Sequence, residues 1–96
     1  MKVYLLEQNT TEGWDTYDSV VVIAEDVEDA RNIHPSSFVT HIRGGKWRGT
    51  NISGEEYSTG EGTWAKYEDI DSIEATYIGE TDKERGVILA SFNGGY

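Results

Sequence analysis

The sequence predicts an α+β fold with an open, mainly antiparallel sheet of four to five strands and one short helix. Three observations lead to this prediction. Apolar residues are concentrated in short runs rich in β-branched side chains, one segment alone combines helical spacing with capping residues, and aromatic residues make up 11% of the 96 residues. The aromatic content and the clustering of apolar residues favour a folded chain, although low hydrophobicity with high net charge is otherwise typical of disorder. We therefore expect a single domain over residues 1–96.

Three apolar runs have the length of a strand, and they occupy residues 3–6, 20–24 and 86–92. Continuous runs of this kind are typical of strands covered on both faces, so the prediction is that all three are central strands. Residues 72–78 indicate a more amphipathic strand, and residues 37–42 a weaker one.

The helix is predicted over residues 27–34. Asp26 is a suitable N-cap, and Glu28 and Asp29 lie in the first turn, where negative charge complements the helix dipole. Pro35 ends the helix because the residue before a proline is disfavoured in the helical conformation.

Residues 44–62 hold six of the eleven glycines and no apolar run, which predicts a long glycine-rich loop, irregular or hairpin-like. Loops of this length in a small domain are usually functional or mobile. One helix cannot cover both faces of a four- or five-stranded sheet. Either this loop or a second copy of the chain must cover the other face, and the second case predicts a homodimer.

The charge of the chain excludes several classes of partner. Eighteen acidic and eight basic residues give a net charge of −10, which repels nucleic acid and anionic membranes. Cysteine is absent, so disulfides, thiolate zinc sites and cysteine nucleophiles are excluded. No apolar run approaches the length of a membrane span, and the first residues lack a signal peptide pattern. We expect a soluble, cytoplasmic protein.

The charge is distributed unevenly along the chain. Residues 32–54 contain no acidic residue but include Arg43, Lys46 and Arg48, a net charge of +3, which leaves −13 on the rest of the chain. Trp47 lies among these bases, as in single-strand binders, but three charges are too few to hold a polyanion. This basic window is either a solvated loop or a site for an acidic patch of a partner protein or a small phosphorylated ligand.

A second candidate site precedes the strand at residues 20–24. Trp14, Asp15, Tyr17 and Asp18 place two carboxylates beside two aromatic rings, a combination that suits a cation or a polar ligand. Together with Trp47 they would form a small-ligand pocket. Aspartate and serine before a strand equally form turns that satisfy loop backbone, so a structural role remains the alternative.

No pattern of catalytic or metal-binding residues is present. There is no nucleophile elbow, and the acidic residues 68–71 lack the spacing and the glycine of a calcium loop. The sequence therefore predicts neither an enzyme nor a bound cofactor or metal.

Two blocks of sequence resemble a group of small, uncharacterised acidic proteins from bacteria and their phages. The matching patterns are YLLxQN, GWDTYDSxVVxA and ExARxIHP in residues 4–35, and IGE and GVIxASFNxG in residues 78–95. The resemblance covers about half of the chain and implies a small accessory protein, without an activity to transfer.

Small acidic phage proteins of the anti-restriction and anti-CRISPR type act by binding host machinery, and some imitate nucleic acid by displaying carboxylates. This context and the charge predict a protein-binding module that inhibits a host nucleic-acid-handling or defence complex. The alternatives are a small-ligand-binding domain and a structural accessory or virion protein. The contact surface is predicted to comprise seven acidic residues, namely Glu25, Asp26, Glu28, Asp29, Glu68, Asp69 and Asp71.

Overall fold

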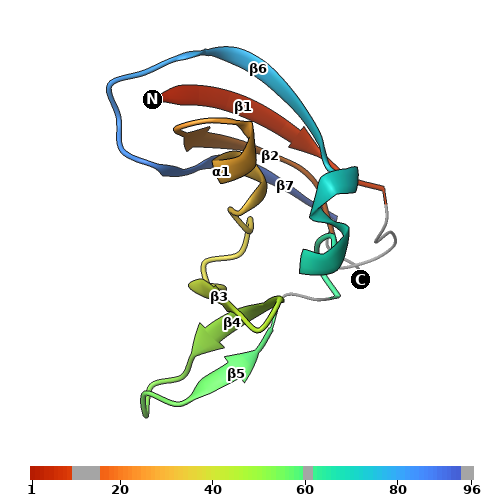
Figure 1. Ribbon diagram of the computed structural model, residues 1–96, viewed down its shortest axis with the longest axis vertical. Helices are drawn as coiled ribbons and strands as arrows, with labels where there is room; N and C mark the ends of the chain where they lie inside the picture. Colours follow the sequence, from red (N-terminus) through yellow and green to blue (C-terminus); the bar gives the residue numbers. More distant parts are fainter. Residues whose placement is uncertain (10–15, 60–61, 94–96) are drawn as a thin grey trace.

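The computed structural model describes residues 1–9, 16–59 and 62–93, and its ribbon is shown in Figure 1. The chain is mainly β with two short helices, so the α+β prediction is confirmed in outline. In chain order the elements are β1 (Lys2–Glu7), β2 (Thr16–Ala24), α1 (Val27–Arg31), β3 (His41–Arg43), β4 (Lys46–Thr50), β5 (Glu56–Ser58), the 3-10 helix η1 (Tyr67–Ser72), β6 (Glu74–Glu80) and β7 (Gly86–Asn93).

Four strands form an antiparallel sheet in the order β6-β1-β2-β7. The apolar runs at residues 3–6 and 20–24 lie in β1 and β2, the two inner strands, as predicted. The third run lies in β7, which is an edge strand, so its prediction as a central strand is wrong. A local run of apolar residues indicates a strand, but it does not reveal how many neighbours that strand has.

The core lies on one face of this sheet. Leu6 on β1 and Val20 and Val22 on β2 are fully buried, as their alternate spacing along the strands requires. Ala30 of α1 packs onto them, and further buried residues close the cluster, namely Trp47, Trp64, Ala65 and Ile73. The three-stranded sheet and the segment after it therefore contribute to the same core as α1.

The helix α1 begins as predicted and ends three residues early. The side chain of Asp26 accepts a hydrogen bond from the backbone N–H of Asp29, which is the expected N-cap. At the other end, the backbone N–H of Asn32 bonds to Asp29 and closes the last turn, so residues 32–34 lie outside the helix. His34 is buried, and its Nδ1 accepts a hydrogen bond from the backbone N–H of Ser36.

The predicted long loop at residues 44–62 is largely a second sheet, with strand order β3-β4-β5. Gly44 and Gly45 form the turn between β3 and β4 with φ of +62° and +71°, a combination typical of a tight hairpin and easily adopted by glycine. Strand β3 starts at His41 rather than at residue 37, because residues 36–39 form a turn closed by a bond from Val39 to Ser36. Gly44, Gly45 and Gly54 thus lie in the hairpin turns with positive φ, and Gly49 lies where a side chain would collide with the carbonyl of Phe38.

The last two predicted strands differ slightly from the observed ones. Strand β6 covers Glu74–Glu80 instead of residues 72–78, and β7 covers Gly86–Asn93 instead of residues 86–92. Strand β6 begins at Glu74 because η1 occupies the residues up to Ser72.

Within the described residues, no helix has the length and apolar character needed to cross a membrane.

Candidate functional site

The ends of the helices α1 and η1 are in contact although residues 32–66 separate them in sequence. The Tyr67 hydroxyl donates a hydrogen bond to Oδ1 of Asn32 at 2.9 Å, and Arg31 Nε donates one to the carbonyl of Ile73 at 3.1 Å. These two bonds join the two ends of η1 to the C-terminal end of α1. The contact brings Glu28 of α1 and Asp71 of η1 to one cavity, whereas Glu68 lines another one together with Lys46 and Lys66. We call the seven predicted acidic residues the acidic surface.

A cavity of about 230 Å³ lies between the two helices on this surface. Glu28 from α1 and Asp71 from η1 line it, together with Arg31, Asn32 and Ile70. It thus offers two carboxylates from different helices, the positive charge of Arg31 and one apolar wall.

Two members of the acidic surface have structural roles. Asp26 caps α1, as described above. Asp29 receives Arg85 Nε at 2.8 and 3.0 Å on its two carboxylate oxygens, and it accepts the backbone N–H of Glu25 at 3.0 Å. Asp29 therefore joins α1 to the turn between β6 and β7, and its charge is compensated by an arginine that the sequence did not single out.

The other five carboxylates of the acidic surface are exposed. Their side chains form no hydrogen bond or ion pair with any residue in the described part of the chain. They are Glu25, Glu28, Glu68, Asp69 and Asp71. Their negative charge is available to a partner.

The bases of the window at residues 32–54 also come together in space. Arg43 and Lys46 are cross-strand partners on β3 and β4, and Arg48 Nε donates a hydrogen bond to the carbonyl of Arg43 at 3.3 Å. Glu56 on β5 lies among them, 3.4 Å from Arg43 and 3.9 Å from Arg48. The basic window is thus a patch whose charge is partly compensated by one glutamate.

Glu56 also forms a 2.8 Å hydrogen bond with Nε2 of His41. This bond is the main reason why the pKa of Glu56 is lowered, and the positive charges of Arg43 and Arg48 act in the same direction. Nothing in the local sequence indicates this residue, because it reaches the bases only through the pairing of β5 with β4.

Trp47, one residue of the predicted ligand pocket, is buried. Its indole Nε1 donates a hydrogen bond to the carbonyl of Ala65 at 2.9 Å, and its ring makes edge contacts with His34 and Tyr67 at 5.1 and 5.3 Å between centroids. Tyr17 is half-buried, and its ring lies edge-on to that of His34 at 6.5 Å between centroids. Trp14 and Asp15 lie outside the described residues, so their part of the prediction stays a prediction.

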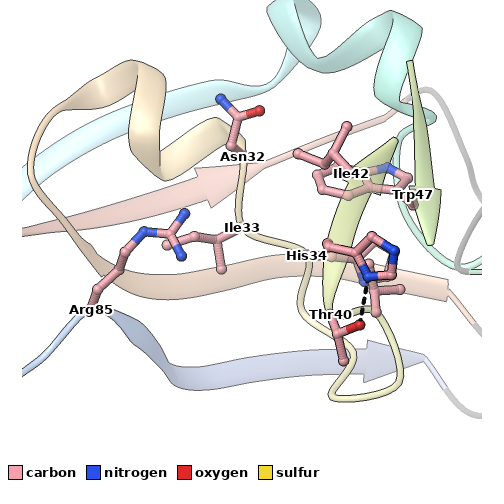
Figure 2. A pocket seen from close by; sticks show the side chains of 9 residues that line it. Asn32, Ile33, His34, Thr40, Ile42, Trp47 and Arg85 are labelled. Atoms are coloured by element: carbon pink, nitrogen blue, oxygen red, sulfur yellow. Dashed lines mark hydrogen bonds between the residues drawn. The ribbon is translucent and has the colours of Figure 1, made fainter. Parts of the chain in front are cut away.

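The cavity that Trp47 lines is small, about 100 Å³. Figure 2 shows that its walls come from the end of α1, from β3 and from Arg85. Ligand pockets typically measure several hundred Å³, so this cavity is too small for a metabolite of ordinary size.

Asp18 lines a larger cavity of about 340 Å³ near the start of β2. Two further carboxylates line it, from Glu7 and Glu74, and it reaches Ser72 at the end of η1. In the described ranges no three acidic, histidine or cysteine side chains are grouped as metal ligands would be. The three carboxylates of this cavity place further negative charge beside the end of η1.

Comparisons with protein families, with curated proteins and with solved structures find no match to this chain.

Proposed function

We propose that this protein is a non-enzymatic binding module whose acidic surface occupies the basic groove of a host nucleic-acid-handling or defence protein. The observation that supports the proposal is the cavity between α1 and η1, which is lined by Glu28 and Asp71, two exposed carboxylates without a hydrogen bond or ion pair among the described residues. The resemblance of both ends of the chain to small acidic proteins of bacteria and phages supports the same context.

The physical basis is electrostatic complementarity. A groove that binds DNA or RNA is lined by arginine and lysine side chains, and a fixed array of carboxylates attracts them as phosphates do. The bonds from Tyr67 to Asn32 and from Arg31 to Ile73 hold the two helices together before binding. Such preorganisation reduces the conformational entropy lost on association.

The cavity between Glu28 and Asp71 is the part of the surface best suited to a single arginine of the partner. A guanidinium group forms charge-assisted hydrogen bonds with carboxylates, and Ile70 offers an apolar contact to its methylene groups. Buried arginines of this kind are frequent among the residues that dominate binding energy.

A charge-reversal experiment tests the proposal. The variant Glu28→Lys/Asp71→Lys changes two carboxylates that have no structural bond, so the fold should be retained. Immobilised wild-type protein and variant are exposed to a bacterial lysate, and retained proteins are quantified by mass spectrometry. We expect proteins captured by the wild type to be lost by the variant, and to be released from the wild type by duplex DNA.

The matched control is Glu55→Lys/Glu84→Lys, which makes the same change in net charge at two exposed positions outside the acidic surface. It should capture the same proteins as the wild type. If the Glu28→Lys/Asp71→Lys variant retained them equally well, the acidic surface would not be the binding surface.

A further inference from the structure

The strand β7 forms one edge of the four-stranded sheet, and its side chains are unusual for an edge. Three consecutive apolar residues are exposed, with Val87 at 42%, Ile88 at 54% and Leu89 at 67%. Leu89 pairs with Val21 of β2, which in turn pairs with Leu5 of β1. Val20 and Val22 point into the core, so Val21 between them points to the opposite face of the sheet. The cross-strand row of Leu5, Val21 and Leu89 therefore lies on that opposite face and ends at the exposed Leu89.

The charges of the strands distinguish β7 from the rest. Each of the other six strands contains at least one Asp, Glu, Lys, Arg or His, whereas β7 contains none over eight residues. The opposite edge, β6, begins with Glu74 and ends with Glu80. Charged residues on an edge strand are a common protection against strand pairing, and β7 lacks this protection.

We propose that two copies of this chain associate through β7, which pairs antiparallel with its counterpart about a two-fold axis. The backbone groups along the free edge of β7 are then satisfied, and the two sheets become one sheet of eight strands. An edge strand is complementary to itself in this arrangement, because the same surface is used by both copies.

The net charge of the chain favours this edge over others. Two copies with a charge of −10 each repel one another, and the repulsion at close contact is smallest where no ionised side chain is brought together. Pairing through β6 would instead bring the carboxylates of Glu74 and Glu80 near those of the second copy. The apolar residues of β7 add hydrophobic burial to the backbone bonds.

A bulge limits the length of regular pairing. Ile88 is an additional residue between the pairs Val22–Val87 and Val21–Leu89, so the ladder with β2 is interrupted there. We therefore place the contact in the part of β7 from Leu89 onward.

The test is the molar mass in solution, measured by light scattering and by sedimentation equilibrium over a dilution series. The wild type should show twice the mass of one chain at high concentration and dissociate on dilution. Leu89→Lys should be a monomer throughout, because each lysine would bring a charge without a counter-charge into the apolar contact. This change reduces the net negative charge, so greater overall repulsion cannot explain the loss.

The matched control is Ile78→Lys, which makes the same substitution at a 53% exposed residue on the opposite edge strand. It should remain dimeric. Circular dichroism of both variants verifies the fold. Added salt should strengthen the wild-type dimer, since it screens the repulsion between the acidic copies.

A second measurement does not depend on Leu89. The chain has no cysteine, so Ser91→Cys introduces a single thiol on β7 and Ile52→Cys one at a fully exposed hairpin position. We expect disulfide-linked dimers to form faster for Ser91→Cys. A wild type that stays monomeric, a Leu89→Lys variant that stays dimeric, or equal cross-linking of the two cysteine variants would overturn the proposal.

Discussion

In the four-stranded sheet, β1 and β2 contribute several fully buried side chains to the core, among them Leu6, Val20 and Val22. The three-stranded sheet contributes one large side chain, that of Trp47, while Ile52 between β4 and β5 is completely exposed. Ile42 of β3 also packs against the core, but it is only partly buried. The ion pairs centred on Glu56 lie at the surface and join strands of the three-stranded sheet to one another.

This difference indicates how each sheet is stabilised. The burial of apolar area is the dominant favourable term in folding, and exposed ion pairs contribute little. The four-stranded sheet therefore has many contributions to its stability, and the loss of one can be tolerated more easily. The three-stranded sheet depends on Trp47, which anchors it to the core and to η1 through Tyr67.

The largest expected effect is that of Trp47→Ala. Truncation of a buried tryptophan typically costs about 3–5 kcal/mol of unfolding free energy. We expect a loss in this range from urea unfolding followed by circular dichroism. The control Ile52→Ala should change the free energy by less than about 0.5 kcal/mol. If the two variants were equally stable, the three-stranded sheet would not depend on its tryptophan.

A finer comparison uses the two buried tryptophans. Trp47 Nε1 has a hydrogen-bond partner, the carbonyl of Ala65, whereas Trp64 Nε1 is buried without one among the described residues. Substitution by phenylalanine removes similar ring volume from both. Only Trp47→Phe leaves a carbonyl without its donor, which costs about 1–3 kcal/mol more. Equal unfolding free energies of Trp47→Phe and Trp64→Phe would show that this bond contributes nothing.

The smallest effect concerns Glu56. Because its pKa is lowered in the folded protein, the ionised carboxylate stabilises the fold. This stabilisation is present above the ordinary carboxyl pKa and is lost as the pH falls through the lowered pKa. Glu56→Gln should therefore be less stable than the wild type at neutral pH, and the difference should vanish in acid.

The neighbouring Glu55 provides the control for this pH dependence. Its side chain is exposed and forms no bond with the described residues, so Glu55→Gln should match the wild type at both pH values. Urea unfolding at the two pH values measures the difference. A gap between Glu56→Gln and the wild type that persists below the pKa of Glu56 would contradict the electrostatic explanation.

Much of the fold could be predicted from short-range patterns. The runs in β1 and β2, the Asp26 cap of α1 and the strand β6 were all visible in the sequence, because each depends on residues within one turn or one strand. Six of the seven acidic residues predicted for the contact surface are exposed, as expected from their charge. Their division into structural and unpaired carboxylates was not predicted, because the partner of Asp29 is Arg85, far along the chain.

The sequence by itself determined that β1, β2, β6 and β7 become strands and that α1 becomes a helix, where the negative charge is concentrated and which residue types are absent. The tertiary structure alone decided that β7 lies at an edge, that residues 41–58 form a second sheet, that Trp47 is an anchor and that Glu56 joins the bases. The physical reason is the range of the interactions. Backbone preference and capping act between near neighbours, whereas strand order, burial and ion pairing depend on residues that are distant in sequence and meet only after folding.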